Sequence, residues 1–283
     1  PVLGRASIAL DKVKALESQL ENQLENQAES STTNQQLSHS QANTLSSPNN
    51  NTSLQQLHCR EVSHTYYRER EDGHFTLGPI NLQLNAGELV FITGGNGGGK
   101  TTLALLLTGL YAPEQGDLLI NDEVSSQQQP QQYREHFSAI FTDFCLFEDI
   151  LNQGNEQQIQ QARDYLKHLQ LDHKVEIENG KLSTVELSTG QRKRLALLSA
   201  YLEDRPCYLF DEWAADQDPV FKNFFYTKIL PDLKASNKLI IAITHDDAYF
   251  HLADRVLKVD QGQVLEITER SEEEGEVLEA VGS

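Results

Sequence analysis

Glycines dominate residues 94–102, whose sequence is Gly-Gly-Asn-Gly-Gly-Gly-Lys-Thr-Thr. This G-x-x-x-x-G-K-[ST] pattern is typical of a phosphate-binding loop when a strand precedes it and a helix follows it. Glycine permits positive φ angles and lets backbone N–H groups approach an anion without a Cβ atom in the way. Lys100 is expected to reach the β- and γ-phosphates, and the Thr101 hydroxyl is expected to bind Mg²⁺. The predicted nucleotide-binding residues are Gly94, Gly95, Asn96, Gly97, Gly98, Gly99, Lys100, Thr101 and Thr102.

Two adjacent carboxylates, Asp211 and Glu212, follow the apolar run 207–210. A carboxylate at the end of a buried strand can hold Mg²⁺, and the next one can orient or deprotonate an attacking water. An apolar run that ends in two acids is common at strand ends, so the phosphate loop upstream is what gives this pair its meaning. We therefore predict a metal site at Thr101 and Asp211, and a catalytic base at Glu212.

The elements that must position these residues follow from the hydropathy pattern. Short apolar runs at 89–92, 207–210 and 239–243 predict buried strands, and 103–107 predicts the helix after the loop. A helix expected at 219–233 separates two of these strands, which indicates a parallel crossover unit. Further predicted elements are strands at 58–66, 75–84, 117–122 and 137–141, helices at 131–136, 157–169 and 191–202, and a closing hairpin of 255–259 with 263–267.

The two ends of the chain differ from this pattern. An apolar seam predicts an amphipathic helix over residues 1–26, which packs either on its own domain or on a neighbour. Residues 27–57 are rich in Gln, Asn and Ser and predict a disordered linker, and the acidic tail 271–283 is also expected to be disordered. Because the chain begins at Pro1 and contains no Met, we expect a fragment of a longer protein.

Composition narrows the possible functions. The net charge of −19 disfavours a nucleic-acid partner, because such proteins carry basic surfaces. No apolar run approaches the ~20 residues that cross a bilayer, and no secretory signal is visible. The three cysteines lack metal-ligand spacing, and their odd number favours a reducing compartment over a disulfide framework.

The segment 187–191, Leu-Ser-Thr-Gly-Gln, opens the predicted helix 191–202. It resembles the signature motif of ATP-binding-cassette (ABC) ATPases, with Thr189 in place of the usual glycine. The resemblance implies an α/β P-loop NTPase fold over residues 58–270, with a mixed core sheet, an antiparallel β subdomain and a helical subdomain at about 144–205. It also implies that Ser188, Thr189, Gly190 and Gln191 contact the γ-phosphate held by an opposite subunit, while Ser188 caps its own helix.

Other positions resemble family elements in the expected order. Tyr66 resembles the aromatic residue that stacks on adenine, with Tyr67 as the alternative. Asp218 matches the residue that reaches across a dimer, and His245 matches the histidine that contacts the γ-phosphate and the catalytic water. One element departs from the family, because Thr142 stands where a glutamine is usual, followed by Asp143. An oxygen ligand for Mg²⁺ remains possible from either residue.

Segments 137–144, 211–219 and 244–247 resemble the branch of the family that exports cyclic peptides and peptide siderophores. In that branch a transmembrane domain precedes the ATPase in the same chain, and residues 1–20 of the predicted helix 1–26 resemble the helix that leaves that domain. The resemblance implies ATP and Mg²⁺ as cofactors, catalysis by Glu212, His245 and Lys100, and homodimers that close on ATP. It also implies a transmembrane partner domain and a place on the cytoplasmic face of the bacterial inner membrane.

The apolar run 144–147 is expected either to dock that domain or to pack inside the helical subdomain. A soluble cassette ATPase and a nucleotide sensor with weak hydrolysis remain as alternative functions.

Overall fold

A computed structural model describes residues 54–68, 73–151, 155–268 and 277–280. These residues all lie in the second of two units into which the chain divides, Thr52–Ser283. The predicted helix 1–26 and most of the predicted linker lie outside the described residues, so both stay predictions.

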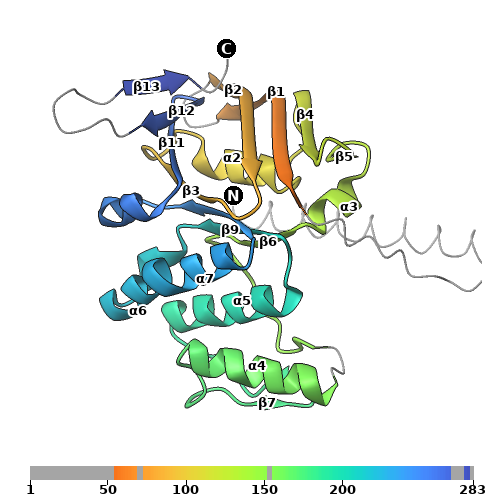
Figure 1. Cartoon of the computed structure of the whole chain (residues 1–283), viewed down its shortest axis with the longest axis vertical. Coiled ribbons are helices and arrows are strands. Elements are labelled where there is room, and N and C mark those ends of the chain that lie inside the picture. Colours follow the sequence, from red (N-terminus) through yellow and green to blue (C-terminus); the bar gives the residue numbers. More distant parts are fainter. Residues whose placement is uncertain (1–53, 69–72, 152–154, 269–276, 281–283) are drawn as a thin grey trace, which may run out of the picture. The chain divides into compact units, whose positions relative to one another are not determined.

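A seven-stranded sheet forms the centre of this unit, in the order β13-β12-β11-β3-β10-β9-β6 (Figure 1). Five neighbouring strands are parallel, and β12 and β13 extend the sheet antiparallel at one edge. The bounds are β3 Leu89–Thr93, β6 Phe137–Ile140, β9 Cys207–Asp211, β10 Leu239–Ile243, β11 Arg255–Asp260, β12 Gln263–Thr268 and β13 Val277–Ala280. The predicted crossover between the strands β9 and β10 is confirmed, since they are adjacent and parallel.

A second, antiparallel sheet has the order β2-β1-β4-β5. Its strands are β1 Gln56–Arg68, β2 Gly73–Asn85, β4 Gln115–Ile120 and β5 Val124–Ser125. This sheet confirms the antiparallel region predicted ahead of the nucleotide strand.

The helices are α2 Lys100–Leu107, α3 Pro130–Arg134, α4 Glu156–His168, α5 Thr189–Glu203, α6 Pro219–Phe224 and α7 Leu230–Ala235. A π-helical turn, Phe225–Ile229, joins α6 to α7, so the single helix predicted at 219–233 is continuous but irregular. Short 3₁₀ turns cover Trp213–Asp216 and Asp247–Leu252, and β7 Ile177–Glu178 pairs with β8 Lys181–Leu182.

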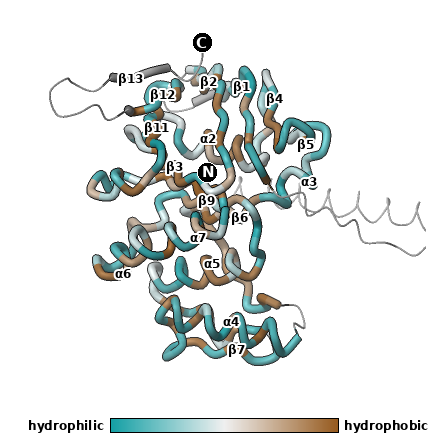
Figure 2. Tube along the Cα trace, in the orientation of Figure 1, coloured by the Kyte–Doolittle hydropathy of each residue, from teal (hydrophilic) through white to brown (hydrophobic). Residues whose placement is uncertain are grey.

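Two hydrophobic cores lie on opposite faces of the central sheet. Successive side chains of a strand point to opposite faces, so Val90 and Ile92 join the core shared with α2 and the antiparallel sheet. Leu89 and Phe91 join the core formed with α4, α5, α6 and α7. Because both faces are covered, the inner strands are apolar at nearly every position, and Figure 2 colours β3 and β9 largely as hydrophobic.

Two predicted boundaries are wrong. Leu54 and Leu57, placed in the disordered linker, are buried in the core, since Leu57 lies at the start of the strand β1 and Leu54 just before it. Part of the tail predicted to be disordered is the strand β13, which pairs with β12. The physical reason for β13 is that the edge strand β12 offers unpaired backbone groups that another strand can satisfy.

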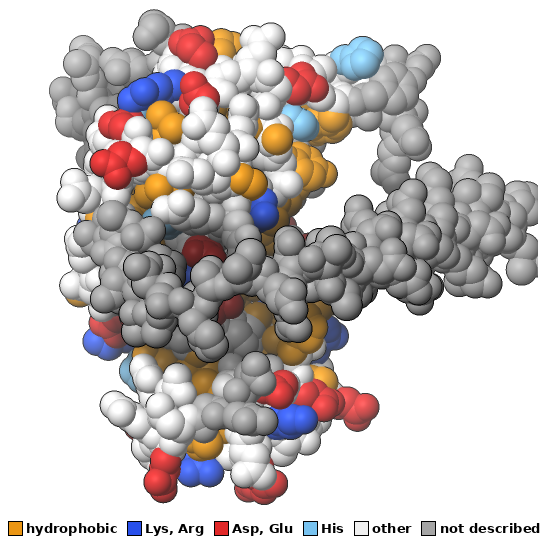
Figure 3. Space-filling view, turned by 90° about the vertical axis from the view of Figure 1, so that its right-hand side faces the viewer, with side chains coloured by type: hydrophobic (Ala, Val, Ile, Leu, Met, Phe, Trp, Pro, Cys, Tyr) orange, Lys and Arg blue, Asp and Glu red, His pale blue; other side chains and the backbone are white. Residues whose placement is uncertain are grey.

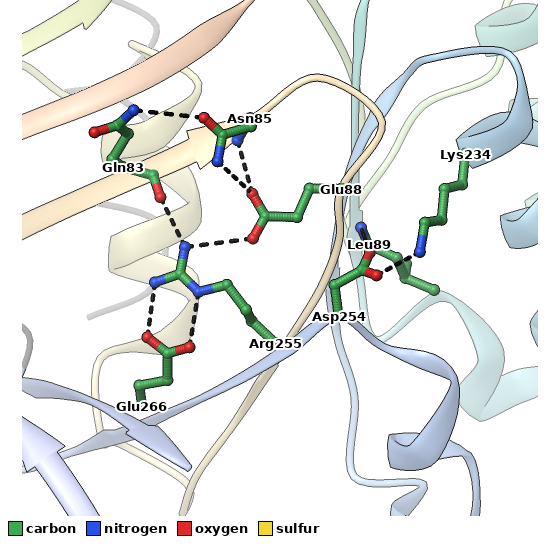
Figure 4. A network of polar contacts seen from close by, with 8 residues as sticks. All are labelled: Gln83, Asn85, Glu88, Leu89, Lys234, Asp254, Arg255 and Glu266. Atoms are coloured by element: carbon green, nitrogen blue, oxygen red, sulfur yellow. Dashed lines mark hydrogen bonds and ion pairs between the residues drawn. The ribbon is translucent and has the colours of Figure 1, made fainter. Parts of the chain in front are cut away.

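A polar network fixes the start of β3, the strand that leads to the glycine loop (Figure 4). The Arg255 guanidinium donates two hydrogen bonds of 2.9 Å to the Glu266 carboxylate and one of 2.7 Å to the Gln83 carbonyl. The Asp254 carboxylate accepts a 2.7 Å hydrogen bond from the Leu89 backbone N–H. Donating hydrogen bonds to the Glu266 carboxylate raises the pKa of Arg255. The network therefore joins both sheets where β3 begins.

Candidate functional site

The glycine loop spans residues 94–99 between β3 and α2, in the predicted strand–loop–helix order. Gly94, Gly97 and Gly99 have φ angles of 138°, 76° and 111°, a region that favours glycine. A Cβ atom on Gly94 would lie 2.0 Å from the carbonyl oxygen of Val259 in β11, so this position also lacks room for a side chain. The loop conformation thus depends on a neighbouring strand as well as on its own glycines.

Lys100 begins α2, and its side chain folds back over the loop. Its ammonium donates hydrogen bonds to the carbonyl oxygens of Gly94 at 2.9 Å and Gly95 at 3.2 Å. The residue is only 6% exposed, although Gly95, Asn96 and Gly97 beside it are exposed. The cation is therefore already held at the place where an anion would enter the loop.

Three side-chain oxygens converge beside the loop, one from the first turn of α2 and two from residues at or just after the ends of β9 and β6. The Thr101 hydroxyl donates to Asp211 Oδ2 at 3.3 Å, and the Thr142 hydroxyl donates to the same oxygen at 3.5 Å. Asp211 is 3% exposed, and its burial, followed by the nearby Glu212 carboxylate, raises its pKa. A carboxylate with two hydroxyls suits Mg²⁺, which takes few protein ligands and several others from water or phosphate. Within the described residues, no cluster of three His, Cys, Asp or Glu side chains could hold a metal by itself.

Glu212 and His245 meet because their strands are neighbours. The register pairs Asp211 of β9 with Ile243 of β10, and the Glu212 N–H donates to the Ile243 carbonyl at 3.1 Å. His245 Nε2 lies 3.4 Å from Glu212 Oε1, and the two side chains are 49% and 37% exposed. Glu212 has a positive φ of 48°, which turns the chain out of the strand. Both side chains thus remain accessible to a bound molecule at the edge where the parallel strands end.

The predicted signature residues lie in a separate hollow. Ser188 caps α5 by a reciprocal capping box with Gln191, each hydrogen bond being 3.4 Å long. A hollow of about 400 Å³ is lined by Ser188, Thr189, Gly190, Gln191, Arg194, Asp216, Gln217 and Asp218. Its lining combines the signature segment with Asp218, but includes none of the glycine loop. Within one copy, the structure therefore does not unite Ser188 with Lys100.

Sequence reasoning missed the residues that tie α5 to the loop after Asp211. Lys193, which is 1% exposed, donates to the Glu212 carbonyl at 2.9 Å and pairs with Asp216 at 2.7 Å. Arg194 contacts Asp218 at 2.5 Å and Gln217 at 3.0 Å. The run Gln-Arg-Lys-Arg at 191–194 was the available signal, since three successive cations at the start of an otherwise apolar helix leave some of them buried and in need of partners.

The predicted adenine-stacking residue lies among other aromatics. The Tyr66 and Phe75 ring centroids are 5.4 Å apart. A Cβ atom on Gly99 would lie 3.3 Å from the Phe75 ring, so Phe75 is the aromatic residue that packs on the loop itself. Stacking by Tyr66 stays a prediction, and the Tyr67 side chain lies outside what the structure describes.

The apolar run 144–147 divides between two environments. Phe144 and Leu146 pack against the core that contains α4 and α5. Phe147 is 77% exposed, and Cys145 is also exposed. Phe144 and Leu146 therefore suit the expected role in packing the helical subdomain, and the exposed Phe147 suits the expected role in docking another domain. Across the described ranges, none of the helices combines the length and apolar character needed to cross a membrane.

Comparison with known proteins agrees with this geometry. Residues 77–215 match the family model described as ABC transporter. The chain is 49% identical over 212 residues to the ATP-binding protein SyrD of Pseudomonas syringae pv. syringae, which covers 74% of this chain and 38% of the relative. It is 31% identical over 220 residues to the subtilin transport ATP-binding protein SpaT of Bacillus subtilis, covering 69% of this chain and 34% of the relative. The chain thus spans little more than a third of each.

Solved structures share the fold. A bacterial Atm1-family ABC exporter with ATP bound has a TM-score of 0.63 at 21% identity, covering 78% of this chain and 40% of the other. A dimeric post-hydrolysis state of the ATP-binding cassette MJ0796, bound to ADP and Pi, has a TM-score of 0.60 at 18% identity, covering 76% and 99%. The predicted α/β P-loop fold of an ABC ATPase is confirmed.

Proposed function

We propose that this chain, which carries an ATP-binding ATPase domain of the ABC transporter family, couples Mg²⁺-dependent ATP hydrolysis to export of a peptide, of the cyclic or siderophore type. The observation that supports hydrolysis best is the convergence at the ends of β3, β9 and β10. There the buried Lys100 ammonium, the Thr101–Asp211 pair and the Glu212–His245 pair border one glycine loop. A phosphate anchor, a metal-binding carboxylate and a base beside a histidine together match the requirements of phosphoryl transfer to water.

Each residue has a part in the proposed reaction. The loop N–H groups and the α2 N-terminus bind the phosphates, and Lys100 exchanges its carbonyl partners for phosphate oxygens. Thr101 and Asp211 would hold Mg²⁺, which when bound would supply positive charge beside the phosphates. The Glu212 carboxylate orients the attacking water and accepts its proton. His245 donates a hydrogen bond toward the γ-phosphate while Glu212 lies beside it.

The site is completed, in this proposal, by a second copy. Ser188 with its neighbours lies in a hollow apart from Lys100, exposed for a triphosphate held by another subunit. The γ-phosphate then bridges two surfaces, whereas ADP leaves one of them without a partner, so ATP favours closure and hydrolysis favours opening. Asp218 borders the same hollow and would contact the second copy.

A membrane domain is the proposed partner for coupling, which places the cassette on the cytoplasmic face of the bacterial inner membrane. The exposed Phe147 offers an apolar contact for that domain. The family model described as ABC transporter and the relative described as a subtilin transport ATP-binding protein both support transport. The described side chains on the face in Figure 3 mix carboxylates with a few basic groups, an arrangement that does not favour nucleic acid.

The test compares ATP turnover and oligomeric state in the wild type and Glu212→Gln. We expect Glu212→Gln to keep ATP affinity, to lose turnover and to form a dimer under saturating Mg-ATP, as measured by light scattering. A variant that turns over ATP at the wild-type rate would remove Glu212 from the mechanism. Equal and negligible turnover in both proteins, with ATP still bound, would support the nucleotide-sensing alternative.

Transport is tested by the genomic sequence upstream of Pro1. Several apolar segments of ~20 residues there support an exporter. Their absence, together with no separately encoded membrane partner, would support the alternative of a soluble cassette ATPase.

A further inference from the structure

The π-helical turn Phe225–Ile229 places a buried tyrosine beneath the His245 loop. Tyr226 is 1% exposed and lies among aromatic rings. Its ring stacks on Tyr249 at 4.2 Å between centroids and meets Phe91 of β3 edge-on at 5.8 Å. A π turn inserts an extra residue into a helix, and such turns occur often at functional sites. Here the turn brings the Tyr226 hydroxyl to the end of β10.

The Tyr226 hydroxyl lies between two side chains that flank His245. It donates to Asp246 Oδ2 at 3.0 Å and lies 2.6 Å from the Thr244 hydroxyl. A phenol has only one proton to donate, so the Thr244 hydroxyl must donate to the phenol oxygen. Burial raises the pKa of Tyr226, which keeps that proton in place at neutral pH. The Thr244 oxygen in turn accepts the Asp246 N–H at 3.0 Å.

Two further contacts hold the same loop. Lys222 of α6 pairs with Asp246 Oδ1 at 2.9 Å. The Thr244 N–H donates to the Ile92 carbonyl of β3 at 3.0 Å. Asp218 caps α6 by accepting the Phe221 N–H at 2.9 Å. Lys222 of α6 and Tyr226 of the π turn therefore hold Asp246, while Tyr226 and β3 hold Thr244.

His245 itself is half-exposed, so its imidazole depends for its place on the backbone of residues 244–246. We propose that Tyr226 is a positioning residue for ATP hydrolysis, which holds Thr244 and Asp246 so that the His245 ring stays beside Glu212. This inference rests on the proposed hydrolytic function. It adds a buried residue that sequence motifs do not reveal.

The test uses Tyr226→Phe, which removes the hydroxyl but keeps the ring and its stacking. Tyr208→Phe is the matched control, because Tyr208 is equally buried and its hydroxyl donates to the Ala200 carbonyl at 3.2 Å. Tyr249→Phe controls for a hydroxyl removed from the same aromatic stack. For the full chain, kcat and KM for Mg-ATP and the melting temperature are measured for all four proteins.

We expect Tyr226→Phe to lower kcat about tenfold, the effect of one or two lost hydrogen bonds, while KM stays within about twofold. Tyr208→Phe is expected to lower the melting temperature to a similar degree and to leave kcat unchanged. Thr244→Val, which removes the other hydroxyl, should lower kcat similarly, and the double variant should be no slower than the slower single variant. A Tyr226→Phe protein with wild-type kcat, or a kcat loss equal to that of Tyr208→Phe, would overturn the proposal.

A second readout does not depend on turnover. The His245 imidazole resonances, identified by their loss in His245→Gln, are expected to shift in nucleotide-free Tyr226→Phe but not in Tyr208→Phe. Unmoved resonances would also overturn the inference. Failure of the proposed function would give a different result, because ATP turnover would then be no higher in the wild type than in Glu212→Gln.

Discussion

Replacing Gly94 by alanine tests whether the glycine loop is shaped by the strand beside it. The added Cβ atom would lie 2.0 Å from the Val259 carbonyl oxygen and 3.0 Å from its carbonyl carbon. Both are backbone atoms of β11, which pairs with β3 on one side and β12 on the other. The strands β3 and β11 cannot move apart without losing the hydrogen bonds between them. A rotamer change cannot relieve the contact either, because it joins a Cβ atom to backbone atoms.

The cost follows from two terms. A side chain at a φ of 138° is strained by roughly 1–3 kcal/mol. Displacement of Gly94 or Val259 to a normal contact distance adds further backbone strain of at least ~1 kcal/mol. A total of about 3 kcal/mol corresponds to a fall in melting temperature of roughly 6–12 °C for a domain of this size. Nucleotide affinity should fall as well, because Gly94 carries one of the carbonyls that hold Lys100.

Thermal unfolding of the nucleotide-free chain measures this cost, and Gly95→Ala is the matched control. A Cβ atom on Gly95 meets no atom within 4 Å, so its melting temperature should stay within about 2 °C of the wild type. Calorimetric titration with Mg-ATP then reports binding for both variants. If Gly94→Ala had the same melting temperature as the wild type and Gly95→Ala, the packing of β11 on the glycine loop would not constrain the loop's conformation, and the reasoning would be refuted.

Three other predictions follow from the site. Lys100→Ala should weaken ATP binding about a hundredfold, since it removes charge-assisted hydrogen bonds to two phosphates, and unchanged affinity by calorimetry would refute the loop assignment. Asp211→Asn should raise the unfolding free energy of the nucleotide-free chain, because the raised pKa of Asp211 means that folding disfavours its ionised form. The same variant should lose the Mg²⁺ dependence of ATP hydrolysis, because it lacks the carboxylate that would bind the metal. With Asp211 protonated at low pH, the wild type should be at its most stable, and it should lose that stability as the pH rises through the raised pKa of Asp211. Its Mg²⁺ affinity should increase over the same pH range. Equal urea-unfolding profiles of the wild type and Asp211→Asn across these pH values would contradict this prediction. Phe147→Ser should change the unfolding free energy by less than about 0.5 kcal/mol, because the ring is 77% exposed, and a larger loss would show that it belongs to the core.

Prediction from sequence succeeded where a structural element depends on contiguous residues. The glycine loop, Lys100 and Thr101 form one run whose spacing is set by how a backbone wraps an anion, and the apolar run before it predicts its strand. The acids Asp211 and Glu212 end a strand whose burial on both faces requires an unbroken apolar run. These features could be predicted from the sequence because each depends on local chain geometry or on the simple rule that buried strands are apolar.

Prediction failed, or had no basis, where long-range packing decided the position of a residue. Leu54 lies in a polar segment, and only its contact with the core shows that the folded unit includes it. Phe75 packs on Gly99 because β2 crosses beside the loop, and no local pattern marks it. Tyr226 reaches Thr244 only through a π turn, which propensity does not predict.

The sequence by itself determined the kind of chemistry, because glycines, a lysine and paired carboxylates at these spacings have few other uses. The tertiary structure decided which of these groups meet, since it brings Thr101 to Asp211 across 110 residues of chain. It also placed Ser188 apart from the loop, in a hollow beside Asp218. The physical reason is that residue types set what a group can bind or transfer, whereas the order of strands in the sheet sets which groups can act on the same molecule.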